Sequence, residues 1–290
     1  MGSGNWTATS YSTYSKSVGR KVTADGVLDG TFSAQEMFKQ RKCADALNPF
    51  RVVRECRDSD EHPNTVPVIL GLDVTGSMGS SAVEVAKKIN VIMTNLYEKC
   101  KDIEFMIMGI GDLAYDNAPI QISQFESDVR IAEQLDKIYF EGGGGGNGFE
   151  SYTAAWYMGT RHTDLDCLRR GEKGIIITMG DELLNPYLPK SKLNYVTGDM
   201  LERDVETKNL FNEAQEKFDI YHLVVKHDWY SDDQSEKNFK SFANIIGEEN
   251  VKIVNLETIS GTIIEIIMNK YNNSTKFSEN ENLGRDTISW

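Results

Sequence analysis

Thiol and imidazole side chains are scarce in this sequence. Its 290 residues include only 4 cysteines and 4 histidines. The cysteines stand far apart, at Cys43, Cys56, Cys100 and Cys167, with no CxxC spacing, and the histidines show no metal-ligand spacing. This scarcity argues against zinc or copper chemistry, and no Ser/His/Asp or Cys/His triad is indicated. Widely separated cysteines favour free thiols in a cytoplasmic protein over a disulfide framework.

Positive charge and long apolar runs are also lacking. Lys and Arg number 31 against 44 Asp and Glu, which gives a net charge of −13. A non-specific nucleic-acid site needs clustered basic side chains, so we expect no nucleic-acid partner. No apolar run approaches the ~20 residues of a membrane span. Residues 1–6 lack the apolar core of a secretory signal. We therefore expect a globular protein that does not engage a membrane.

The sequence does contain a regular alternation of apolar runs and amphipathic stretches from residue 66 onward. Apolar runs predict strands at 66–73, 103–110, 119–125, 174–179, 219–225 and 250–254, with 119–125 at a sheet edge. Apolar residues at helical spacing predict helices at about 82–99, 127–138, 150–159, 204–217, 233–246 and 258–271. This order indicates an α/β, Rossmann-like doubly wound fold with a mostly parallel sheet of about six strands flanked by helices.

The segments that flank this region have a different composition. Residues 1–61 read as an N-terminal extension, partly extended or poorly ordered at its start, although the aromatic side chains Trp6, Tyr11 and Tyr14 could pin it to a surface. Within it, a capping box of Ser33 and Glu36 predicts a short helix at 33–47. Residues 62–271 form the predicted α/β domain, and residues 272–290 a loose polar tail.

Three oxygen-bearing side chains follow the first predicted strand. They are Asp73, Thr75 and Ser77, at alternate positions of a turn between the strand and a helix. Such a turn lies at the carboxyl end of a parallel strand, where α/β proteins usually bind ligands. A carboxylate beside two hydroxyls suits a hard cation such as Mg²⁺. The alternative interpretation is a tight turn with a helix cap, since the same residue types are favoured there.

Two later segments resemble this arrangement. The glycine run 142–146 precedes Asn147 and Glu150 inside the folded region, and consecutive glycines let the backbone adopt positive φ or approach a ligand closely. The buried run 174–179 ends at Gly180, Asp181 and Glu182. No Gly-Lys-Ser/Thr follows the glycines, so a phosphate-binding Walker A loop is weakly supported. Loops that follow different strands of one sheet can meet at one edge.

Two other polar groups follow predicted strands. Asp112 and Asp116 come after the second strand and could flank the same edge, but we interpret them as solvated turn residues. The segment that begins at His227 follows the fifth strand and could line a partner surface, but we interpret it as a capped loop.

The first and third loops resemble the metal-ion-dependent adhesion site (MIDAS) of the von Willebrand factor type A (vWA) domain. In that family the first loop carries Asp-x-Ser-x-Ser, the second a Thr and the third an Asp. Asp73, Thr75 and Ser77 match the first loop, with Thr in place of the first Ser and its hydroxyl retained. Asp181 matches the third loop.

The second loop departs from the family pattern. Asn147 stands at about the place of the Thr, and Glu150 lies one turn further on. The glycine-rich second loop and the Gly-Asp-Glu third loop are most similar to an intracellular phage and bacterial branch of the family. The resemblance covers about 62–271.

This resemblance implies a protein-binding function that depends on Mg²⁺, with Mn²⁺ and Ca²⁺ as alternatives. The hydroxyls of Thr75 and Ser77 would touch the metal, and Asp73 and Asp181 would hold it directly or through water. The second-loop ligand is either the oxygen of Asn147 or the carboxylate of Glu150. Because Mg²⁺ takes six oxygens, one position is left for an Asp or Glu of a partner protein. The family also implies MoxR-type AAA+ ATPases as partners, and a binding affinity that changes when the last helix moves.

Two other functions stay open from the sequence. One is a Mg²⁺-dependent phosphohydrolase that uses Asp73 as nucleophile or metal ligand. Thr75 stands where aspartyl phosphatases usually have a second Asp, which disfavours it. The other is a scaffold whose site is degenerate and empty, for which the Asn147 departure is the main support.

Overall fold

A six-stranded sheet forms the centre of the protein. The computed structural model describes residues 4–143, 148–228 and 231–283, with side chains described as far as residue 271. The strands run in the order β12 (Val251–Val254), β11 (Phe218–Val225), β7 (Gly174–Gly180), β2 (Val66–Asp73), β3 (Ile103–Ile110), β4 (Ile120–Ile122). All neighbouring pairs are parallel except β3 and β4. The predicted fold class is therefore confirmed, and so is the edge position of β4.

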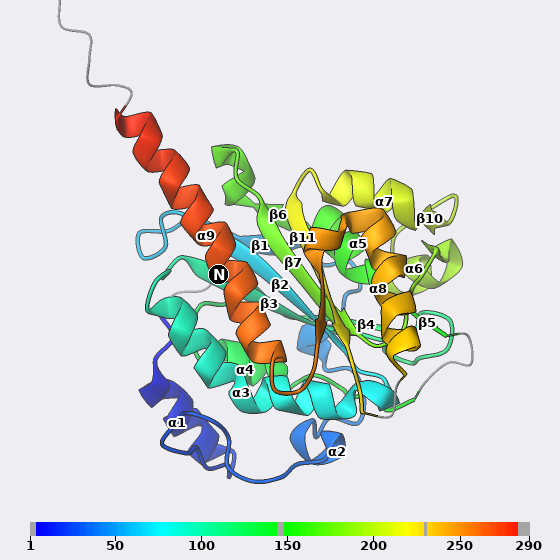
Figure 1. The fold of residues 1–290 in the computed structure, drawn as a ribbon. Helices are drawn as coiled ribbons and strands as arrows, with labels where there is room; N and C mark the ends of the chain where they lie inside the picture. The colour runs from blue at the N-terminus through cyan, green and yellow to red at the C-terminus, as the bar shows by residue number, and fades with distance from the viewer. Residues whose placement is uncertain (1–3, 144–147, 229–230, 284–290) are drawn as a thin grey trace, which may run out of the picture.

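Helices cover both faces of this sheet (Figure 1). On one face lie α3 (Gly79–Tyr97), α4 (Arg130–Leu135) and α9 (Ile259–Leu283), and on the other lie α5 (Thr153–Arg161), α7 (Thr207–Ala214) and α8 (Asp232–Ile246). Alternate residues of a strand point to opposite faces. In β2, Val68, Leu70 and Leu72 therefore join the core under α3, whereas Ile69 joins the core under α5. Burial on both faces explains why the strand is a continuous apolar run.

Several short elements have no counterpart among the sequence predictions. They are β1 (Arg54–Cys56), β6 (Thr163–Leu165), β5 (Phe149–Glu150), β8 (Leu183–Leu184), β9 (Tyr187–Leu188), β10 (Val205–Glu206) and α6 (Lys190–Thr197), with the 3-10 turns η1 (Asp45–Leu47), η2 (Gly76–Met78), η3 (Asp166–Arg170) and η4 (Glu248–Asn250). The strands pair in twos outside the main sheet, β1 with β6, β5 with β8 and β9 with β10. Strands of two or three residues are too short for a repeating apolar pattern to show.

From residue 4 onward the N-terminal segment is ordered and packed, which corrects the expectation that its start is partly extended or poorly ordered. Helix α1 (Ala8–Ser17) begins after Thr7, whose hydroxyl oxygen accepts a hydrogen bond from the backbone of Ser10. The aromatic pinning is confirmed for Trp6 and Tyr11, which are both buried, and the Trp6 indole donates a hydrogen bond to Asn90 of α3. Contacts with distant residues, which local sequence does not show, hold this segment in place.

The remaining flanking predictions differ in their outcome. The capping box of Ser33 and Glu36 is confirmed, but helix α2 (Ala34–Met37) that it opens is much shorter than predicted. At the other end, α9 continues past the predicted end at 271 to Leu283, so residues 272–283 of the predicted loose tail are helical, and residues 284–290 lie outside the described residues. The apolar pattern stops at about residue 271, but a helix can continue through polar residues because its backbone hydrogen bonds are local. Within the described residues, no helix has the length and apolarity that crossing a membrane requires.

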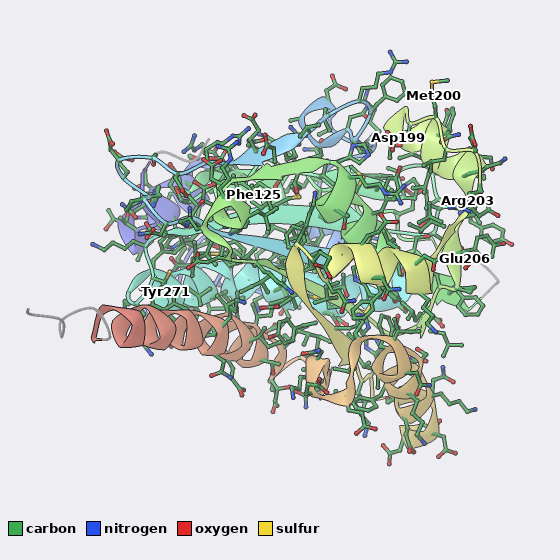
Figure 2. The ribbon with its side chains drawn as sticks, turned by 90° about the horizontal axis from the view of Figure 1, so that it is seen from above. Phe125, Asp199, Met200, Arg203, Glu206 and Tyr271 are labelled. Atoms are coloured by element: carbon green, nitrogen blue, oxygen red, sulfur yellow. The ribbon has the colours of Figure 1, made fainter. Side chains whose placement is uncertain are left out.

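A partly buried polar cluster contacts the end of α5. Asp199 accepts hydrogen bonds from the hydroxyls of Tyr157 and Thr197, and one of its oxygens lies 2.8 Å from Nε2 of His162. The other ring nitrogen of His162 lies 3.0 Å from the carbonyl oxygen of Val52. Asp199 lies far from Tyr271 of α9 (Figure 2). The cluster therefore joins three distant segments at the side of the molecule away from α9.

We expect Asp199→Asn to lower the free energy of unfolding by about 2 kcal/mol at pH 7 and by less at pH 3. Partial burial raises the pKa of Asp199, but its hydrogen bonds outweigh burial and hold the pKa below the ordinary 3.8. The stabilisation is therefore complete above pH 3.8 and is lost as the pH falls through the lower folded value. Urea unfolding of both proteins from pH 3 to 7 measures this, and a difference independent of pH would contradict it.

Candidate metal centre

The predicted site lies at the carboxyl edge of the sheet, between β2 and β7. The chain passes from β2 to β3 on one side, and later returns to form β7 on the other side of β2. The connections that leave β2 and β7 therefore run to opposite sides of this point in the sheet, and α/β sheets usually bind ligands at such a point. Asp73 ends β2 and Asp181 directly follows β7, so the fold brings the first and third loops together.

The first loop is a tight turn organised by Asp73. Its Oδ1 accepts hydrogen bonds from the backbone nitrogen of Thr75 at 2.9 Å and from Oγ1 of Thr75 at 2.5 Å. Asp73 is fully buried and Thr75 is almost so. The turn therefore places a carboxylate and a hydroxyl side by side at the strand end.

Ser77 connects the first loop to the third. Its Oγ lies 3.1 Å from Oδ1 of Asp181 and donates a hydrogen bond to it. Ser77 is half-buried whereas Asp181 is fully buried. Two residues separated by more than a hundred positions in the sequence thus meet directly, as the predicted site requires.

Two further side chains contact the carboxylates of the site. The hydroxyl of Tyr152 donates a hydrogen bond of 2.8 Å to Oδ2 of Asp73. Nε2 of His227 lies 3.2 Å from Oδ2 of Asp181, and the side-chain amide of Asn238 donates to the carbonyl oxygen of Asp181. His227 lies in the loop after β11, and Ser231 caps α8 beyond it, so the predicted capped loop is confirmed; the burial of His227, which is 4% exposed, was not predicted. The available signal was that His227 follows β11, which is parallel to β7, because residues after parallel strands meet at one edge of the sheet.

The second loop packs against the first through its glycines. The nitrogen of Gly76 donates to the carbonyl of Gly143 at 2.7 Å, and the nitrogen of Gly142 donates to the carbonyl of Val74 at 3.2 Å. Gly142 has φ +65°, as the glycine run suggested. Asn147 lies outside the described residues. Glu150 is buried in β5, whose partner β8 belongs to the third loop, so the three loops converge.

Carboxylates are crowded at this edge. Burial, followed by the charge of Asp181, raises the pKa of Asp73 to about 7. Burial, followed by the charges of Asp73 and other acids, raises the pKa of Glu150 to about 10. Asp112 is 3% exposed, so its interpretation as a solvated residue is wrong; the Asp116 carboxylate accepts a hydrogen bond from its backbone. A cation placed among these groups would favour their ionised forms.

The donors fit a hard cation held partly by hydroxyl groups. Within residues 4–143, 148–228 and 231–283, no three His, Cys, Asp or Glu side chains are grouped so as to hold a metal ion. A cation between Asp73 and Asp181 would therefore need the hydroxyls of Thr75 and Ser77 as well. Such an all-oxygen set suits Mg²⁺, Mn²⁺ or Ca²⁺ and does not suit a soft metal.

Comparison with known proteins finds similarity only among solved structures. No protein-family model and no curated protein matches the chain. It is similar to the pilus adhesin SpaC of Lactobacillus rhamnosus GG in its open conformation, with 12% identity, a TM-score of 0.47 and coverage of 73% of this chain and 30% of that one. It is also similar to proximal thread matrix protein 1 of the mussel byssus, with 10% identity, a TM-score of 0.47 and coverage of 76% and 49%.

A third similar structure is the vWF domain of the type V pili tip protein Mfa5 from Porphyromonas gingivalis. The identity is 10%, the TM-score is 0.42, and the match covers 78% of this chain and 98% of that one. The chain spans less than half the length of the SpaC and byssus structures. The α/β architecture of this protein is defined by its own sheet order, and its function must be argued from its own site residues.

Proposed function

We propose that this protein is a Mg²⁺-dependent protein-binding module, in which the metal accepts an Asp or Glu carboxylate from a partner protein. The observation that carries the proposal is the contact between Ser77 and Asp181, because it joins two oxygen-rich loops at the sheet edge. Asp73 and Thr75 add a second carboxylate–hydroxyl pair to the same site.

The chemistry of these residues explains why a partner carboxylate is the expected ligand. Thr75 and Ser77 are neutral, so they would hold a divalent ion without cancelling its charge. Asp73 and Asp181 are the carboxylates of these two loops, and Asp73 already shares its oxygens with two hydroxyl donors, which lowers the negative charge that it would give to the metal. A bound Mg²⁺ would supply positive charge for a further anionic oxygen, and it normally keeps exchangeable positions for one.

The phosphohydrolase alternative is not favoured by the geometry. Thr75, whose hydroxyl donates to Asp73, stands where an aspartyl phosphatase usually carries its second Asp. Within the described part of the chain, no lysine or arginine forms an ion pair with Asp73 that could neutralise a phosphate.

Calorimetric titration with Mg²⁺ and Mn²⁺ tests the proposal. We expect saturable binding by the wild-type protein and by Asp25→Ala, an exposed carboxylate control, and no measurable binding by Asp73→Ala. At 100 times the dissociation constant, the metal should add about 2.7 kcal/mol to the free energy of unfolding of the wild type.

Capture of partners from cell extract, with and without EDTA, then tests the protein-binding role. Partners retained only with the metal would support it, and so would their absence from Asp73→Ala. Equal metal binding by Asp73→Ala and wild type would overturn the proposal. Absence of any metal-dependent change in melting temperature would favour the degenerate scaffold instead.

A further inference from the structure

The two acids of the site have comparable surroundings, although Asp73 accepts a hydrogen bond from Tyr152 whereas Asp181 lies within ion-pair distance of His227. Each acid directs one oxygen to a hydroxyl of the first loop, Asp73 to Thr75 and Asp181 to Ser77. Each directs its second oxygen to a side chain from a different element, Asp73 to Tyr152 and Asp181 to His227. Neither Tyr152 nor His227 belongs to the sequence pattern that predicted the site.

Tyr152 is held in a rigid position. It directly precedes α5, is fully buried, and its ring centroid lies 5.1 Å from that of His222 and 5.7 Å from that of Phe242. Its hydroxyl also accepts a hydrogen bond from the backbone nitrogen of Glu182 in the third loop. Tyr152 therefore contacts both metal-site loops at once, through Asp73 and through Glu182.

The position of His227 follows from strand pairing. The parallel register of β11 and β7 pairs Val224 with Gly180, so the segments that follow the two strands begin side by side. This brings His227 beside Asp181, and their side chains are almost completely excluded from solvent. A contact between buried groups restricts rotation of the carboxylate more than a contact at the surface would.

We propose that Tyr152 and His227 are positioning residues that set the metal affinity of the site by fixing the second oxygens of Asp73 and Asp181. The inference rests on the proposed function, since it concerns the same metal. A carboxylate with one oxygen held cannot rotate freely, so its other oxygen stays directed at the site. Removing a side chain that holds a metal-binding carboxylate typically weakens metal affinity 10- to 100-fold.

Mn²⁺ affinity, measured by calorimetry and by the EPR signal of free Mn²⁺, tests the proposal in four variants. We expect Tyr152→Phe and His227→Leu each to weaken binding by about 10- to 100-fold. His227→Gln keeps a polar side chain beside Asp181 and should bind more tightly than His227→Leu. Tyr157→Phe is the matched control, because it also removes a tyrosine–carboxylate hydrogen bond, to Asp199 outside the site.

The melting temperature of each metal-free protein separates positioning from folding. We expect Tyr152→Phe and Tyr157→Phe to lower it similarly, while only Tyr152→Phe loses metal affinity. Wild-type affinity in both Tyr152→Phe and His227→Leu would overturn the inference and leave the proposed function standing. An equal loss of affinity in Tyr157→Phe would also overturn it, since the effect would then be general destabilisation. Absence of Mn²⁺ binding by the wild type would overturn the proposed function and this inference together.

Discussion

Replacing Gly180 by alanine should lower the free energy of unfolding by about 3 kcal/mol. An alanine Cβ at this position would lie 2.1 Å from the hydroxyl oxygen of Tyr152 and 2.2 Å from two of its ring carbons. Tyr152 has no exposed surface and contacts His222 and Phe242, so the ring cannot move aside without disturbing the core. Urea unfolding measures the change.

Two comparisons isolate the steric cause of this loss. Gly261→Ala makes the same substitution on an exposed part of α9 with no atom within 4 Å of the added carbon, and it should stabilise the protein by up to about 1 kcal/mol. In a Tyr152→Ala background, Gly180→Ala should cost much less, because the colliding ring is gone. Wild-type stability of Gly180→Ala would contradict the packing of Tyr152 against the end of β7.

Trp6→Ala should lower the free energy of unfolding by about 3–5 kcal/mol. Trp6 is 5% exposed, its ring lies 5.4 Å from that of Tyr11, and its indole nitrogen donates to Asn90. Its removal therefore leaves a cavity in the core beneath α3 and an amide oxygen without its donor. The same chemical unfolding experiment measures the loss.

The nature of this contribution can be tested with two further variants. Trp6→Phe keeps most of the ring and loses the indole N–H, so it should fall between wild type and Trp6→Ala. Tyr195→Ala removes an aromatic side chain that is 83% exposed and should change stability by less than about 0.5 kcal/mol. If Trp6→Ala were as mild as Tyr195→Ala, the N-terminal segment would not be part of the cooperative fold.

The predicted strands show which kind of structure local sequence can determine. Strands β2 and β3 begin and end where the apolar runs begin and end, because each strand is buried on both faces. Strand β1 was missed since it has three residues and exists through pairing with β6, which is distant in the sequence. Helix α1 was missed for a related reason, because its pattern is weak and its anchoring side chains contact α3.

The site shows the same division. Asp73, Thr75, Ser77 and Asp181 were predicted because each stands just after an apolar strand, and parallel strands end at one edge. The structure brings Ser77 and Asp181 to 3.1 Å, which that rule alone could not specify. Tyr152 was hidden within a helical pattern, where a buried aromatic residue normally indicates core packing.

The class of fold, and the edge of the sheet that carries the oxygen-rich loops, could be predicted from the order of residue types, because buried strands appear as apolar runs and their ends as polar turns. The contacts of Tyr152 and His227 with the acids of that edge, and the place of Trp6 and Tyr11 in the core, are known only from the folded structure. These contacts join residues that are far apart in sequence, and their energies depend on distance and burial in the folded chain, which no local pattern records.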